Sequence, residues 1–347
     1  MLMFNRQVRP GALINLADNF IHLARLVRLD TRPIEIDALA EIDPSNEDAF
    51  TTWLSTHFKE GTRTGYIPAY CGFHPAQRVL MRENVNARRF SETNYLAPIF
   101  MEAAKVSSVK DWQIAALQPN EGVPPLPDGV VRPALLLGIP WTVIREQQQN
   151  LLAFGLRPRR LELGTLPMLG SLCRHLSVSG RNHAIAVCEV EYAQTRLYVV
   201  AKDGVHTLPP LPHGLLSILE TGMKEVGAPD IATARRQMEE PPEAMKVHDR
   251  RVVRALSRHL KPAIDHFELR TGQRIDSFYC TQLPSRLEWL GEALGAAVEL
   301  ELISPDFEGW LANAGITVDR GSVTLNTSWL STFSLVTNLG ATLPTNG

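Results

Sequence analysis

The side chains most able to do chemistry in this sequence lie within residues 184–214. Glu189, Glu191 and Thr195 flank a predicted hairpin turn there. A turn of this kind can hold a phosphate when its backbone N–H groups point into a concave site. Glu191 opposes this use, because like charges about 4 Å apart repel by about 1 kcal/mol in water and more strongly in a cleft. Whether the turn binds phosphate is therefore the central question about function.

The other reactive side chains form no recognised catalytic or metal-binding pattern. His248, His259 and His266 lie on one helix predicted over residues 243–269, and no second pair completes a tetrahedral metal site. Ser171 follows Gly170 without the rest of a nucleophile elbow. The cysteines are widely spaced and include no CxxC pair, so we expect buried free thiols at Cys71, Cys173, Cys188 and Cys280.

Length and composition indicate a folded protein of two domains. The chain has 347 residues, of which 44% are hydrophobic and 21% charged. A net charge of −2 gives no support for nucleic-acid binding through bulk charge. No apolar run approaches the ~20 residues that span a bilayer, and the first residues lack the apolar core of a secretory signal. We therefore expect a cytoplasmic protein.

Three predicted strands position the turn at Glu191. Residues 184–190, 195–201 and 204–208 are apolar and rich in β-formers, and Asp203 followed by Gly204 signals a tight turn between the last two. The pattern then changes to that of a helix over residues 215–226.

The first half of the chain repeats this plan of strands followed by helices. Residues 11–42 predict strands, and residues 130–139 predict a strand buried on both faces. Three prolines make residues 120–128 a loop between subdomains. Further helices and strands are predicted at 46–59, 140–154, 156–163 and 165–176, with Thr165 as an N-cap.

This order of elements, with several short phrases, resembles PilM, the actin-like cytoplasmic protein of type IV pilus assembly. It also resembles the related cytoplasmic part of GspL in type II secretion. The matching phrases are LLAFGLRP with LEL at 151–163, DG at 203–204 leading to LPHG at 211–214, LGAAVE at 294–299, and the segment 331–343 that contains NLGA. The resemblance covers nearly the whole chain, and the order of the phrases is more specific than any one of them.

The resemblance implies an α/β actin-like, ribonuclease-H-like fold of two lobes with a nucleotide between them. The first lobe would comprise residues 1–180, with an inserted subdomain at about 47–119. The second lobe would comprise residues 181–347, with a helical subdomain at about 215–270.

The nucleotide motifs of the family are degenerate here. The first phosphate hairpin of the family reads Asp-Ile-Gly-Ser/Thr, whereas residues 15–22 read NLADNFIH, where Asp18 is the one acid that could help to hold Mg²⁺. The second reads Asp-Ile-Gly before a Thr, whereas this chain has Glu189, Val190 and Glu191 before Thr195.

The adenosine-binding elements are degenerate too. The Gly-Gly turn that approaches adenosine corresponds to CTQLPS at 280–285, and the ribose-facing Ala-Glu-x-x-Lys corresponds to ARRQM at 234–238. Of the family's nucleotide-binding motifs, only the glycine at Gly214 is present in this chain. We therefore expect no bound cofactor at this cleft.

Three functional hypotheses follow from the resemblance. The first is a non-enzymatic scaffold, a pseudo-ATPase of a type IV pilus or type II secretion platform, peripheral to the inner membrane. It would bind the cytoplasmic tail of a PilN-like inner-membrane partner in a groove between the inserted subdomain and residues 12–29 and 130–139. A GspL role would need a membrane helix and periplasmic domain after the cytoplasmic part, so we expect the PilM role.

The second hypothesis is an ATP- and Mg²⁺-binding switch with a rewired site. It would use Asp18, Glu189, Thr195 and Gly214. The third, a small-molecule kinase on the same fold, ranks last because the sequence offers no candidate for the catalytic aspartate.

Overall fold

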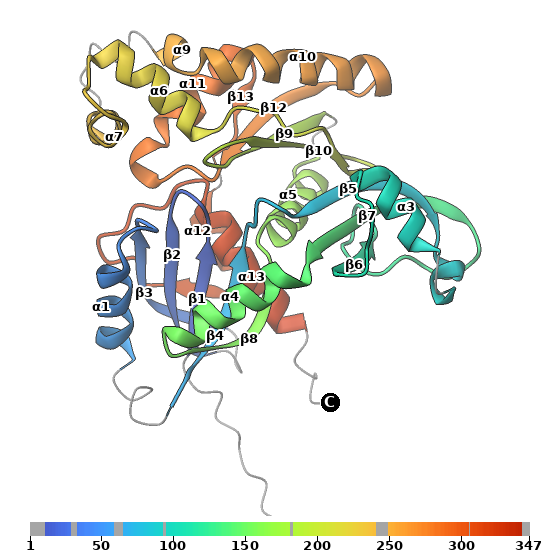
Figure 1. The fold of residues 1–347 in the computed structure, drawn as a ribbon, viewed down its shortest axis with the longest axis horizontal. Coiled ribbons are helices and arrows are strands. Elements are labelled where there is room, and N and C mark those ends of the chain that lie inside the picture. Colours follow the sequence, from blue (N-terminus) through green and yellow to red (C-terminus); the bar gives the residue numbers. More distant parts are fainter. Residues whose placement is uncertain are drawn as a thin grey trace, which may run out of the picture.

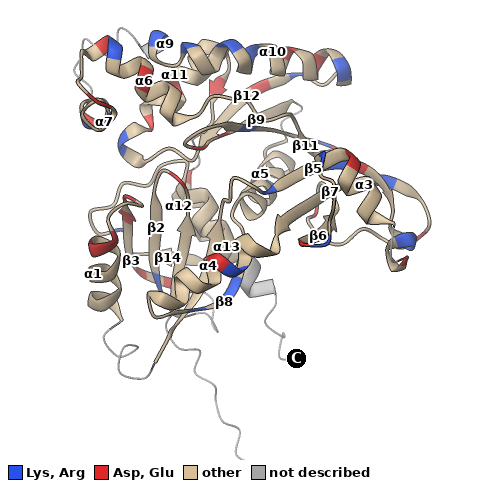
Figure 2. Ribbon diagram, in the orientation of Figure 1, with Lys and Arg blue, Asp and Glu red and all other residues tan. Residues whose placement is uncertain are grey.

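The computed structural model describes residues 11–28, 33–58, 65–92, 95–180, 183–240, 249–304 and 306–341. These residues form two large sheets and one small sheet, with helices outside and between the large ones (Figure 1). None of their helices is long and apolar enough to cross a membrane. Charges of both signs are interspersed along the outer helix α10 (Arg254–Thr271), as Figure 2 shows.

The first lobe is built on a six-stranded sheet with the order β14-β3-β2-β1-β4-β8. β1 pairs in parallel with β4 and antiparallel with β2, so the chain returns to the sheet centre after the first meander. Side chains alternate between the two faces: Ile14 packs beneath α1 (Glu47–His57), whereas Leu13 faces the second lobe. The strands are β1 (Gly11–Leu16), β2 (Ile21–Arg28), β3 (Ile34–Ile42), β4 (Ile67–Phe73), β8 (Leu156–Leu163) and β14 (Ile316–Val318).

The second lobe is built on a five-stranded sheet with the order β11-β10-β9-β12-β13. Its strands are β9 (Ala184–Val190), β10 (Thr195–Ala201), β11 (Gly204–Thr207), β12 (Ile275–Thr281) and β13 (Glu301–Leu302). The two predicted hairpins are present in register, since Val190 pairs with Thr195 and Ala201 with Gly204.

Helices cover the outer face of this second sheet. They are α6 (Leu215–Val226), α7 (Ile231–Glu239), α9 (Asp249–Val252), α10 and α11 (Trp289–Val298), the last preceded by the short η2 (Ser285–Leu287). The single long helix predicted over residues 243–269 was wrong, because Val253 leaves the helical conformation between α9 and α10. His248 and the rest of residues 241–248 lie outside the described part of the chain.

Two helices fill the space between the two large sheets (Figure 1). They are α5 (Thr165–Ser179) and α13 (Trp329–Ala341), and α12 (Phe307–Ala314) packs beside them. Met168, Trp329 and Phe333 share one buried core with residues of both sheets. The lobes are therefore joined by a common apolar core as well as by the contacts described below.

The small sheet has the order β5-β7-β6 and is attached to the first lobe. It comprises β5 (Val79–Asn86), β6 (Trp112–Leu117) and β7 (Val131–Pro140), with η1 (Ala87–Ser91) and α3 (Leu96–Ala104) beside it. These elements begin and end later than the expected inserted segment 47–119, because α1 and β4 pack with the first sheet. β7 is buried on both faces in its middle, where Leu135 packs into the core between the lobes and Ala134 and Leu136 pack into the core of the small sheet. The first three residues of the strand are exposed, with Val131 at 62%.

Candidate functional site

The two hairpins singled out by the sequence meet between the lobes. Asn19, in the turn between β1 and β2, donates hydrogen bonds of 2.8 Å to the backbone oxygens of Val190 and Gln282. The same turn presents Asp18, whose carboxylate accepts from the backbone N–H of Tyr192. The structure thus brings the first-lobe turn against the end of β9, beside the turn that corresponds to the second phosphate hairpin of the resembling family.

Glu189 points inward from β9 and is fully buried. It accepts a 2.8 Å hydrogen bond from Nη2 of Arg78 and another of 2.8 Å from Oγ1 of Thr165. Thr165 is thus not the N-cap of α5, which is Gly164, because its hydroxyl is bound to Glu189. The carboxylate is held by a cation and a hydroxyl of the protein itself.

Glu191 occupies the turn position where the resembling family has glycine. Its side chain is 3% exposed, lies 2.5 Å from Nη2 of Arg78, and lies 2.9 Å from Nε of Arg196. Arg196 also donates to the backbone oxygen of Ala76, which precedes the small sheet. The negative charge of this turn is therefore neutralised by two arginines.

Asp18 lies exposed at the rim of the same cluster. Partial desolvation by the surrounding protein raises its pKa, and the nearby charge of Glu191 raises it further. Arg78 and Arg196 act in the opposite direction. Among the described residues no group of three or more His, Cys, Asp or Glu side chains is arranged to hold a metal ion.

Thr195 and Gly214 are engaged by the protein in the same place. The hydroxyl of Thr195 donates a 2.7 Å hydrogen bond to the backbone oxygen of His213. A Cβ at Gly214 would collide with the backbone oxygens of Glu191 and Tyr192. This close approach lets Leu215, at the start of α6, donate its N–H to Glu191 O at 2.9 Å.

The start of α6 consequently has protein acceptors for N–H groups that could otherwise bind an anion. Leu216 donates to Tyr192 O at 2.9 Å, beside the bond from Leu215. The four site residues predicted from the sequence are thus brought together around one hairpin. Each is bound to other protein groups there.

Gln282 follows β12 where the adenosine turn of the resembling family has glycines. Its φ is 68°, in the left-handed region that non-glycine residues seldom adopt. The conformation is supported from both sides, because its backbone oxygen accepts from Asn19 and its side-chain amide lies 3.3 Å from the acceptor Nδ1 of His74. The side chain of Gln282 is therefore buried in the polar contacts between the lobes.

His74 forms the centre of a buried polar network at the end of β4. Asn15 donates its amide to Ser331 at 2.7 Å, so its oxygen can accept from Nε2 of His74 at 3.1 Å. Burial lowers the pKa of His74 to about 3, and the positive charge of Arg78 contributes in the same direction. His74 is therefore neutral, and it forms no ion pair with Glu189, whose Oε1 lies 3.8 Å from the unprotonated Nδ1.

Further polar contacts join the lobes around this centre. Glu41 on β3 accepts from both the backbone N–H and the hydroxyl of Ser285. Arg235 on α7 reaches Asp43 at 2.9 Å. Arg235 lies in the segment that the sequence analysis matched to the ribose-facing motif of the resembling family, at the glutamate of that motif. In this chain its side chain contacts the first lobe.

The side chains present do not fit a magnesium nucleotide between these hairpins. A phosphate chain needs exposed N–H groups and nearby positive charge. Here two buried glutamates face that position, and Arg78 and Arg196 are already paired with them. The N–H groups of Tyr192, Leu215 and Leu216 also have protein acceptors.

Sequence reasoning missed Arg78 and His74. Both lie on the link between β4 and β5, in a stretch without any motif. One signal was available: two glutamates predicted beside buried strands require a buried cation. The sequence did not indicate which of the chain's arginines supplies it.

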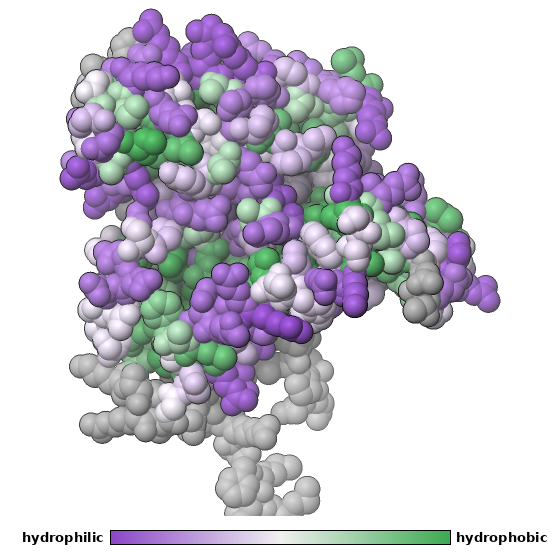
Figure 3. Space-filling model, in the orientation of Figure 1, coloured by the Kyte–Doolittle hydropathy of each residue, from purple (hydrophilic) through white to green (hydrophobic). Residues whose placement is uncertain are grey.

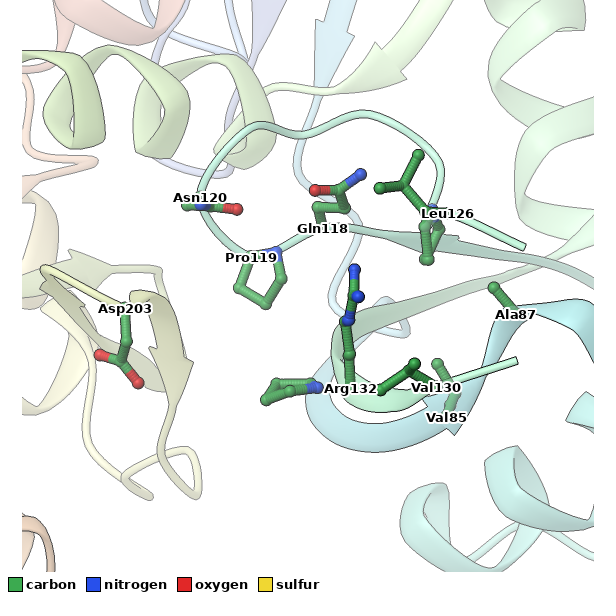
Figure 4. A pocket seen from close by; sticks show the side chains of 11 residues that line it. Val85, Ala87, Gln118, Pro119, Asn120, Leu126, Val130, Arg132 and Asp203 are labelled. Carbon is green, nitrogen blue, oxygen red and sulfur yellow. The ribbon is translucent and has the colours of Figure 1, made fainter. Parts of the chain in front are cut away.

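A separate cavity of about 280 Å³ lies between the small sheet and the second lobe. Arg132 extends into it between Pro119 and Leu126, and Asp203 lies on the opposite side (Figure 4). Both charges have protein partners, since Arg132 pairs with Asp128 at 2.6 Å and Asp203 with Arg82 at 2.7 Å. The cavity lies at the other end of β10 from Thr195 and contains none of the predicted site residues.

No family model matches this sequence, and no curated protein matches it. A solved structure described as the PilM–PilN type IV pilus biogenesis complex superposes on it with a TM-score of 0.72, at 14% identity over 96% of this chain and 99% of that chain. The chain has the actin-like fold. This confirms the fold class expected from the sequence, and the likeness to PilM holds at the level of fold.

Two other solved structures are similar at lower scores. The cytoplasmic domain of EpsL, an inner-membrane component of the type II secretion system of Vibrio cholerae, gives a TM-score of 0.42 at 10% identity over 96% of this chain and 95% of that one. An archaeal actin homologue, Ta0583, gives 0.39 at 9% identity over 96% and 99%. These two scores are too low to support an argument about function.

Proposed function

We propose that this chain is a non-enzymatic, cytoplasmic scaffold of a type IV pilus or type II secretion platform, a pseudo-ATPase that binds a PilN-like inner-membrane partner. The observation that carries the proposal is the likeness in fold, over nearly the whole length of both chains, to the structure of a PilM–PilN complex. The ion-paired glutamates at the nucleotide position support a role without ATP hydrolysis.

The partner would bind where the small sheet joins the first lobe. Helix α4 (Trp141–Ala153) links β7 to β8 across this junction, and only Leu151 of its side chains is buried. Trp141 and Leu152 are each 40% exposed on it. Residues 12–14, which the sequence suggested as part of the groove, are buried in the sheet. Exposed aromatic and aliphatic side chains at such a junction suit the apolar anchors of a peptide.

A binding measurement with a synthetic peptide tests this proposal. The peptide is the cytoplasmic N-terminal segment of the PilN-like membrane protein from the same organism, followed by fluorescence anisotropy. We expect saturable binding, weakened at least tenfold by Trp141→Ala, because truncating a central aromatic anchor costs about 2 kcal/mol or more. Leu269→Ala, an 87% exposed aliphatic on α10, is the matched control and should bind unchanged.

The absence of binding by the unmodified chain would refute the partner assignment. Equal binding by the Trp141→Ala variant would refute the placement on α4 and leave the partner assignment intact.

The ATP-switch hypothesis makes the opposite prediction about nucleotide. We expect millimolar Mg-ATP to leave the melting temperature unchanged, whereas a ligand at 100 times its Kd would add about 2.7 kcal/mol of stability. An upward shift of several degrees would favour the switch. Loss of that shift in Glu189→Gln would then place the nucleotide beside Glu189.

A further inference from the structure

Arg78 is a fully buried cation that no catalytic role explains. It lies on the link that carries the chain from β4 in the first lobe to β5 in the small sheet. Its guanidinium contacts Glu189 and Glu191 of the second lobe at 2.8 and 2.5 Å, and Nη1 donates to the backbone oxygen of Pro75 at 3.1 Å. The side chain therefore joins two lobes at the point where their hairpins face each other.

The charges in this cluster balance only with Arg78 in place. The carboxylates of Glu189 and Glu191 are at most 3% exposed, and Arg196 pairs with only the second of them. Without Arg78, the hydroxyl of Thr165 would be the hydrogen-bond donor left to Glu189 among the contacts described above. A buried carboxylate without a cation is strongly unfavourable, so the closed arrangement of the lobes depends on this arginine.

We propose that Arg78 is a built-in counter-ion that holds the two lobes in one fixed arrangement without nucleotide. Where two lobes close around a ligand, the contacts that the ligand makes with both lobes determine how far they close. Here the protein supplies the bridging charge itself, so the angle between the lobes does not respond to ligand. The inference rests on the proposed nucleotide-free scaffold, but its test measures lobe geometry and not partner capture, so either can fail alone.

The test is a distance measurement between the lobes. Spin labels at Tyr66→Cys on the first lobe and Leu269→Cys on the second are both on exposed positions, and the native cysteines are buried. Pulsed electron paramagnetic resonance then gives the distribution of lobe separations. We expect one narrow distribution in the otherwise unmodified chain, the same with and without millimolar Mg-ATP.

The decisive variant is Arg78→Met/Glu189→Gln/Glu191→Gln, which removes the ion pairs without leaving the glutamates as unpaired buried charges. We expect its distance distribution to broaden or become bimodal. The control is Arg82→Met/Asp203→Asn, which removes a cross-lobe pair whose aspartate is 46% exposed, and its distribution should stay narrow.

Arg78→Met alone should lower the melting temperature by about 5 °C, and the triple variant should recover at least half of that loss. If the single variant does not fold, the triple variant still reports on the lobes. An unchanged narrow distribution in the triple variant would overturn the proposal. So would equal broadening in the Arg82 control, or a Mg-ATP-dependent shift in the unmodified chain.

Discussion

The buried imidazole of His74 should make the fold sensitive to acid. Burial lowers the pKa of His74 from 6.5 to about 3, so below pH 6.5 the unfolded chain binds a proton there and the folded chain does not. Stability is thus present in full above pH 6.5 and is lost as pH falls toward 3. Each pH unit in this window costs about 1.4 kcal/mol, so the loss between pH 6.5 and 4.5 is roughly 3 kcal/mol.

His74→Gln isolates this contribution, because the amide keeps polar groups in the network and does not titrate. Urea unfolding at pH 7.5 and pH 4.5 gives the acid loss of each protein, and the difference between the two losses should be roughly 3 kcal/mol. Charged groups that face the ring, Arg78, Arg196 and Glu191, are present in both proteins and cancel, as does His22. Equal acid losses in the two proteins would refute a neutral, proton-excluding His74.

Three further predictions concern packing. Burial raises the thiol pKa to about 12 at Cys71 and about 11 at Cys173, so the native chain should not react with a disulfide reagent at pH 8. In urea, all four thiols should react with the reagent. Fast reaction of the native protein would contradict the buried positions. Gly164→Ala, at the N-cap of α5, places a methyl group against the buried ring of His74 and should lower the unfolding free energy from a thermal melt by about 1–3 kcal/mol. Gly170→Ala, within α5 and with open space around it, should be neutral or stabilising. Asn19→Ala removes two hydrogen bonds to backbone oxygens and should cost about 1–3 kcal/mol of unfolding free energy; no loss would mean that water replaces them.

Local sequence patterns were sufficient to predict the two hairpins of the second lobe. β9 and β10 each contain a run of five apolar residues, and the Asp203-Gly204 turn fixes the register with β11. α5 was also predicted from its local pattern, within three residues of its observed end. Elements of two or three residues, such as β14, carry too little pattern to be predicted.

From the sequence, the candidate site could be recognised only by the residues that differ from the nucleotide motifs of the resembling family. The sequence showed that Glu191 stands where the resembling family has a glycine, and the structure places its side chain between Arg78 and Arg196. It could not show what neutralises the charge, because Arg78 lies 111 residues before Glu189 and reaches it only through the pairing of the two lobes. The stacking of Trp329 on His22 is equally non-local.

The first lobe also contains the last described residues of the chain. β14 pairs in parallel with β3, and Trp329 at the start of α13 stacks on His22 with ring centroids 3.8 Å apart. The strands synthesised first therefore leave the ribosome with one face of their sheet uncovered. That face stays open until residues 316–341 have been translated, so the lobe cannot be completed before they leave the ribosome. For this chain, translation that stops early should yield an aggregation-prone fragment and not a folded half.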